Sequence, residues 1–77
     1  RTEIKFTLPS DQAVKLKIYN VEGRLVKTLV NGHQDAGAHT VVWSGQDERG
    51  GRVASGLYFY RLTTDSGVLT RKMTLLK

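Results

Sequence analysis

The side chains that could do chemistry are few and poorly placed. The chain has no cysteine, which removes thiol nucleophiles and cysteine-ligated metals. Its two histidines, His33 and His39, stand apart without a carboxylate at ligand spacing, whereas a metal site needs three or four converging ligands. Ser44 and Ser55 have no neighbouring base, and the sequence around Ser44 is not a nucleophile elbow. These residues predict no metal centre and no serine hydrolase site.

The acidic residues are scattered, apart from the adjacent pair Asp47 and Glu48 in a glycine-rich stretch. An EF-hand needs regularly spaced acidic ligands, so this pair instead predicts a turn in which Asp47 accepts a backbone hydrogen bond. Calcium stays open as an alternative, because irregular loop sites also use backbone carbonyls. A glycosidase dyad would need a cleft that a chain of 77 residues can hardly form. We expect no catalysis and no cofactor.

Length and composition indicate one small folded domain spanning residues 1–77. A hydrophobic content of 39% fits a folded chain, and no apolar run approaches the roughly 20 residues of a membrane span. The net charge of +5 comes from basic residues spread along the chain, without interleaved aromatic residues. This pattern favours a solvated sheet face over nucleic-acid binding. We expect a monomer, and the absence of an initial methionine suggests a fragment of a longer protein.

The dominant period of the sequence is two, which is the signature of β-strands. Val14, Leu16 and Ile18, for example, alternate with lysines. The segment 24–30 could also form a helix, but its flanking turns and β-branched residues favour a strand. The predicted strands are residues 4–8, 14–18, 24–30, 39–43, 56–64 and 68–76, with 52–54 as a further short edge strand. The predicted turns are residues 20–23, where Gly23 suits a positive φ, then 31–32, 35–37 and 65–67.

This pattern predicts an all-β fold, an antiparallel sandwich of immunoglobulin or fibronectin-III type with about seven strands. Apolar residues on both faces of 56–64 predict a central, covered strand. Tyr19 falls on the lysine-bearing face of its strand, where it could serve a sugar-binding surface. With no disulfide available, we expect Trp43 to fill the centre of the core. The predicted core residues are Phe6, Leu16, Ile18, Trp43, Tyr60 and Leu62.

One pattern of apolar and turn residues runs through nearly the whole chain. It reads Thr2-x-Ile4-x-Phe6-x-Leu8-Pro9, Val14-x-Leu16-x-Ile18-Tyr19-Asn20-x-x-Gly23-x-x-Val26, Ala36-Gly37-x-His39-x-Val41-x-Trp43-x-Gly45-x-Asp47, Gly50-x-x-Val53-x-Ser55-Gly56-x-Tyr58-Phe59-Tyr60-Arg61-Leu62 and Thr70-Arg71-Lys72-Met73-x-Leu75-x-Lys77. This pattern resembles the C-terminal sorting domains (type A) of the type IX secretion system. It also resembles the related flagellar hook-cap (FlgD) immunoglobulin-like family, to which the stretch 43–58 is closer.

The resemblance implies a seven-stranded sandwich at the C-terminus of a larger exported protein, acting in secretion sorting and cell-surface attachment. The implied partners are an outer-membrane translocon, a sortase-like transpeptidase and anionic lipopolysaccharide, at the surface of a Gram-negative bacterium. The implied recognition residues are Gly23, Gly56, Tyr58, Thr70, Arg71, Lys72, Met73, Leu75 and Lys77. The alternative is a carbohydrate-binding or spacer module of a secreted enzyme, and a flagellar scaffold role is a third reading.

Overall fold

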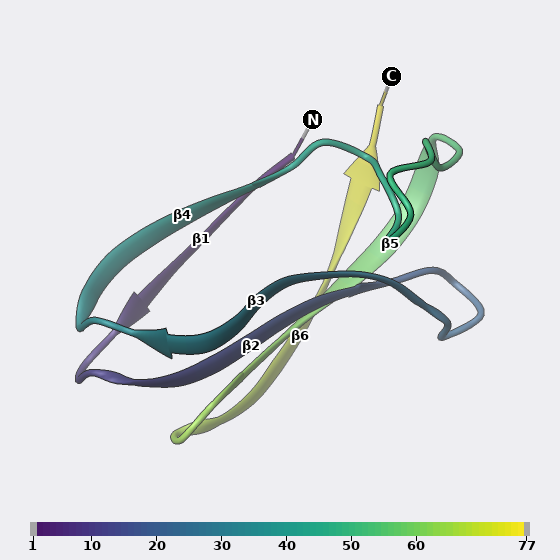
Figure 1. The fold of residues 1–77 in the computed structure, drawn as a ribbon. Helices are drawn as coiled ribbons and strands as arrows, with labels where there is room; N and C mark the ends of the chain where they lie inside the picture. The colour runs from purple at the N-terminus through teal and green to yellow at the C-terminus, as the bar shows by residue number, and fades with distance from the viewer. Residues whose placement is uncertain (1, 77) are drawn as a thin grey trace.

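The computed structural model describes residues 2–76, and its regular elements are six β-strands (Figure 1). The strands are β1 (Thr2–Leu8), β2 (Gln12–Tyr19), β3 (Leu25–Gln34), β4 (Gly37–Trp43), β5 (Gly56–Thr64) and β6 (Gly67–Leu75). Residues 2–76 contain no helix of the length and apolar character that crossing a membrane requires.

The strands form two antiparallel sheets that face each other as a sandwich. One sheet pairs β1 with β4, and the other has the order β3-β2-β5-β6. In Figure 1 the β1–β4 pair lies above the larger sheet, and the connection 44–55 passes from one sheet to the other. The predicted all-β sandwich is confirmed, but with six strands rather than seven. Residues 52–54 do not form a strand, because their pairing with the preceding loop is limited to an isolated bridge between Arg52 and Gln46.

The core lies between the two sheets and follows from the alternation in the strands. Leu16 and Ile18 of β2 are fully buried, as is Trp43 at the end of β4. Phe6 and Tyr60 differ from the prediction, since both are only partly buried and pack against the edge of the core. The small sheet is two strands wide and leaves its margins open to solvent. The buried cluster consists of Ile4, Leu8, Val14, Leu16, Ile18, Val26, Trp43, Tyr58, Leu62 and Leu75.

Strand β3 is longer than the sequence suggested, and the expected turn at Asn31 and Gly32 is wrong. Both residues lie inside β3, where Asn31 pairs with Lys15 and Gly32 pairs with Val14. Pairing with β2 satisfies the backbone groups of this stretch, so the local turn preference is overridden. Two register shifts in the β2–β3 ladder accommodate extra residues of β3. The helical alternative for this segment is excluded by the same pairing.

The other predicted turns are confirmed. In the turn between β2 and β3, Gly23 has a φ of 85°. The side chain of Asn20 supports this turn, because its Oδ1 accepts hydrogen bonds from the backbone N–H groups of Glu22 and Arg24, each at 3.0 Å. The β5–β6 hairpin turns at residues 65–66, between the paired residues Thr64 and Gly67. The chain therefore reverses where its glycine and Asx residues allow.

Strand β5 is central, but it is not covered on both faces as expected. It lies between β2 and β6 in the larger sheet. Tyr58 and Leu62 face the core and are buried, whereas Leu57 on the opposite face is 42% exposed. The small sheet covers the inner face only. The apolar residues on the outer face of β5 therefore remain accessible to a partner.

Gly45 follows β4 and is a position where a side chain would not fit. Its φ is 80°, and an added Cβ would lie 3.1 Å from Cδ2 of the buried Leu75. We expect Gly45→Ala to lower the free energy of unfolding by about 1–3 kcal/mol, because a left-handed conformation and a displaced core side chain both cost energy.

Gly32 provides the matched control for this prediction. A Cβ at Gly32 would meet no atom within 4 Å, and Gly32→Ala is expected to change stability by less than about 1 kcal/mol. Urea denaturation followed by circular dichroism measures both variants. Equal losses for the two substitutions would contradict the proposed contact between Gly45 and Leu75.

Candidate functional surface

Charge is segregated between the strands and the turns of this molecule. None of the seven acidic residues lies in β2, β3, β5 or β6. Those four strands carry six basic residues, which are Lys15, Lys17, Lys27, Arg61, Arg71 and Lys72. The larger sheet is therefore a positively charged layer, with the negative charges placed in β1 and in the loops.

The outer face of the larger sheet, which points away from the core, concentrates four of these cations. Lys15 and Lys17 alternate with the buried residues of β2, so they point outward. Arg61 pairs with Lys17 across β5 and β2, which places two positive charges directly opposite each other. Like charges at such a cross-strand position destabilise a sheet. Lys72 lies on the same face, paired with Phe59.

The same face carries an aromatic pair next to these cations. Tyr19 pairs with Phe59 across β2 and β5, in the row beside Lys17 and Arg61. The Arg61 guanidinium carbon lies 5.0 Å from the centre of the Tyr19 ring, which is cation–π geometry. One face of the ring is therefore already occupied. Because a sugar or a base would need that surface for stacking, this contact makes Tyr19 a poor sugar-binding platform.

A hollow of about 150 Å³ lies beside this aromatic pair, and we call it the outer hollow. Its lining residues come from the β2–β3 turn and from strands β2, β5 and β6. Cofactors and drug-sized ligands occupy pockets of about 300–1,000 Å³, so the outer hollow is suited to one side chain. The residues that line it are Tyr19, Asn20, Val21, Gly23, Phe59, Arg61 and Thr70.

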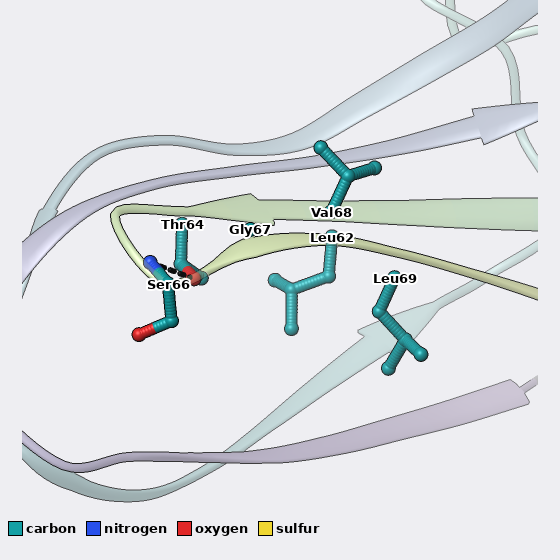
Figure 2. Close-up of a pocket in the computed structure, with 6 residues that line it drawn as sticks. All are labelled: Leu62, Thr64, Ser66, Gly67, Val68 and Leu69. Carbon is teal, nitrogen blue, oxygen red and sulfur yellow. Dashed lines mark hydrogen bonds between the residues drawn. The ribbon is translucent and has the colours of Figure 1, made fainter.

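A second hollow, of about 200 Å³, lies at the β5–β6 hairpin (Figure 2). Figure 2 shows Leu62 and Leu69 pointing the same way from the hairpin, whereas Val68 points away from them. Ser66 N donates a hydrogen bond to Thr64 Oγ1 at 3.1 Å and tightens the turn. No charged side chain lines this hollow, and the polar side chains in its lining are the hydroxyls of Thr64 and Ser66.

The glycine-rich loop between β4 and β5 is confirmed as an Asx-stabilised turn. Asp47 Oδ1 accepts hydrogen bonds from the backbone N–H groups of Arg49, at 3.0 Å, and Gly51, at 2.9 Å. Glu48 fastens the loop to β3, because its backbone N–H bonds to Val26 O at 3.1 Å and its carboxylate accepts from Thr28 N–H. Both acidic side chains therefore have structural roles in this loop.

One group of three potential metal ligands occurs in the part of the chain that the structure describes. Asp11, His33 and Asp35 place their ligand atoms within 4.8 Å of one another, and all three residues are exposed. Asp11 Oδ1 already accepts a hydrogen bond from Ala36 N–H at 2.7 Å. The trio could offer three donors to a cation, but solvent reaches every ligand and one carboxylate already supports the β3–β4 turn.

Two of the remaining candidate residues for chemistry, Ser44 and His39, have neutral hydrogen-bond partners. Ser44 Oγ donates to Gln46 Oε1 at 3.4 Å, so its partner is an amide and not a base. Ser55 is exposed. The Nε2 atom of His39 lies 2.6 Å from Asp35 O, and its ring stacks on Phe6 with centroids 5.2 Å apart. These contacts fix local structure and bring no nucleophile to a base.

The residues that the resemblance assigned to recognition do not form one surface. Tyr58 and Leu75 are buried, and the Tyr58 hydroxyl donates to Ala54 O at 2.7 Å. Met73 packs against the core. Gly56 starts β5, while Arg71 lies on the inner side of β6, opposite Tyr60. Gly23 and Thr70 line the outer hollow, Lys72 lies on the same outer face, and Lys77 is outside the described residues.

Sequence reasoning missed Phe59 and Arg61 as parts of a surface, and it missed the Asp11, His33 and Asp35 trio. The alternation of β5 already placed Phe59 and Arg61 on the face opposite Tyr58 and Leu62, but it could not show which face was covered. His33 and Asp35 stand only two residues apart in sequence, but Asp11 joins them through the pairing of β2 with β3.

Comparison with known proteins points to one family. A sequence profile described as the FlgD Ig-like domain matches residues 1–67. The basal-body rod modification protein FlgD of Salmonella typhimurium is 34% identical over 64 residues, and the protein of the same description from Salmonella typhi gives the same value. The match covers 83% of this chain, and the chain spans 27% of the length of these relatives. The crystal structure of FlgD from P. aeruginosa superposes with a TM-score of 0.73 at 25% identity, covering 95% of this chain and 58% of that one.

These comparisons overturn the functional expectations drawn from the sorting-domain resemblance. The expected sorting and attachment module is wrong, and so is the alternative module of a secreted enzyme, because the matches are to FlgD proteins. The expected translocon, transpeptidase and lipopolysaccharide partners are wrong for the same reason, as is the cell-surface location. Only the FlgD-related part of the resemblance is confirmed. The residues that carried the resemblance lie in the strands and turns of this sandwich, so their spacing indicates the fold rather than the function.

Proposed function

Since this chain belongs to the FlgD Ig-like domain family, we propose that it is a non-catalytic binding domain in bacterial flagellar assembly. The curated relatives are named as basal-body rod modification proteins, and the proposal assigns this domain a part in that process. The profile match over residues 1–67 carries the proposal. The superposition on the P. aeruginosa protein over 95% of this chain supports it.

The arrangement of side chains supports a role in binding rather than in chemistry. Within the described residues, Ser44 bonds to an amide and the loop carboxylates of Asp47 and Glu48 bond to backbone groups. What the fold does provide is a sandwich with one face covered by the small sheet and one basic face uncovered. Such a domain can serve assembly by presenting a fixed surface to another protein.

An exchange of domains tests the proposed function. Residues 1–77 replace the matching segment of the Salmonella typhimurium protein in a strain that lacks that protein, and swarming in soft agar measures flagellar assembly. We expect the chimera to restore swarming and to produce hooks visible by electron microscopy. A matched chimera carries an unrelated β-sandwich domain of similar size, and it is expected to fail.

Two outcomes would contradict the proposal. If the unrelated domain restored swarming as well as residues 1–77, the segment would be a spacer without a specific role. If the chimera were present at normal levels but no hooks formed, this domain would not share the function of the matching segment. Immunoblotting of the chimeras distinguishes the second outcome from loss of the protein.

A further inference from the structure

We propose that the outer face of the larger sheet is a docking site for an acidic segment of a partner protein. In this binding mode, an apolar side chain of the segment enters the outer hollow, and neighbouring carboxylates pair with Lys17, Arg61 and Lys72. The inference deepens the proposed assembly role and rests on it for the kind of partner.

The isolated domain retains an unfavourable pairing of two positive charges on this face. Lys17 and Arg61 stand directly opposite each other on β2 and β5, and like charges in this position oppose sheet formation. Lys15 and Lys72 add to the positive potential of the same face. An incoming carboxylate placed between Lys17 and Arg61 would convert this repulsion into attraction. Arg61 is well suited to that contact, because a guanidinium binds a carboxylate through two parallel hydrogen bonds.

An uncovered apolar surface lies beside these charges. The outer hollow of about 150 Å³ has Tyr19 and Phe59 in its wall. Val21, which also lines it, is 64% exposed, and the neighbouring Leu25 and Leu57 are 48% and 42% exposed. Interfaces commonly combine an apolar centre with a charged rim. This geometry fits one apolar side chain flanked by carboxylates.

The same observations favour a protein segment over a nucleic acid or a sugar polymer. Bases and sugars bind through open aromatic faces, and single-stranded nucleic acid needs several such faces in succession. Here Arg61 lies over the Tyr19 ring. The β2–β3 turn also borders the outer hollow through Asn20 and Gly23, and this turn limits the length of the hollow along the sheet. A peptide needs only one anchor point and nearby cations.

Fluorescence anisotropy with the 77-residue chain tests the proposal. The probe is a short fluorescein-labelled peptide that alternates glutamate and leucine, and the reference peptide has glutamine in place of each glutamate. We expect binding to the acidic probe that weakens as salt is raised, and at least tenfold weaker binding to the glutamine peptide. Labelled oligothymidylate of similar length is titrated in parallel as the nucleic-acid arm.

Substitutions locate the binding face and include a control of equal charge. Arg61→Gln and Lys17→Gln are each expected to weaken binding about two- to fivefold, as exposed ion pairs contribute modestly. Arg71→Gln removes the same charge from the opposite face of the larger sheet and is expected to leave affinity unchanged. Phe59→Ser is expected to weaken binding of the acidic probe without changing the salt dependence.

The outcomes of these binding measurements distinguish the proposed docking site from its alternatives. Equal effects of Arg61→Gln and Arg71→Gln, or no measurable binding, would overturn the proposed site. Tighter binding of oligothymidylate through the same residues would make the face a nucleic-acid surface instead. The domain exchange separates this inference from the proposed function. If the chimera restores swarming but the domain does not bind the probe, the proposed docking site is contradicted and the proposed assembly role is retained.

Discussion

Replacing Trp43 with alanine is expected to lower the free energy of unfolding by about 3–5 kcal/mol, the usual cost of deleting a large buried aromatic side chain. Trp43 has no exposed surface. Its ring meets the Tyr58 ring edge-on at 5.0 Å, and its Nε1 donates a hydrogen bond to Gln46 O at 2.9 Å. The substitution therefore leaves a cavity between the sheets and an unpaired carbonyl in the loop.

Urea denaturation followed by far-ultraviolet circular dichroism measures this loss, because the variant has no tryptophan to report by fluorescence. Val68→Ala is the control, since Val68 is 64% exposed and its truncation is expected to cost less than about 0.5 kcal/mol. If the alanine variant does not fold, the native protein still tests the assignment through its fluorescence. Emission typical of a solvent-exposed indole would contradict burial of Trp43.

Leu16→Ala is expected to cost about 2–5 kcal/mol, because it empties the centre of the larger sheet. Leu16 is fully buried. It lies in β2 between Val30 of β3 and Leu62 of β5 in register, so its side chain is surrounded on both sides. Few neighbours can move inward to fill the space that the substitution leaves.

The adjacent residue supplies the control for Leu16. Lys15 is exposed on the opposite face of the same strand, and Lys15→Ala is expected to change stability by less than about 0.5 kcal/mol. Denaturation curves for the two variants are compared at the same protein concentration. A smaller loss for Leu16→Ala than for Lys15→Ala would show that the strand faces are assigned the wrong way round.

Local features of the sequence predicted the six strands of the sandwich and most turns, but they also predicted an edge strand at residues 52–54 that does not form. The alternation of Val14, Leu16 and Ile18 with lysines placed β2 and its buried face, since successive side chains of a strand point to opposite sides. Gly23 and the Asx residues located turns through their own backbone preferences. The burial of Trp43 was predicted because Trp43 lies in an alternating strand and the chain has no cysteine pair that could occupy the centre of the core. Each of these signals is contained within a few neighbouring residues.

Pairing between distant strands decided what the local signals could not. Asn31 and Gly32 favour a turn on their own, yet they lie in β3 because β2 satisfies their backbone groups. The sheet order set the coverage of β5, leaving Phe59 and Arg61 on an open face. Register across strands, which is not encoded in any one segment, also placed Lys17 opposite Arg61.

The sequence by itself determined that this chain folds as an antiparallel sandwich and where most of its turns lie. The alternation of apolar and polar residues and the positions of turn residues reflect local backbone preferences, so they can be recognised from the sequence alone. Only the tertiary structure decided which face of the larger sheet stays open and which cations gather on it. Those features arise where β2, β5 and β6 meet, because contacts between strands far apart in sequence depend on the order of the strands in the sheet.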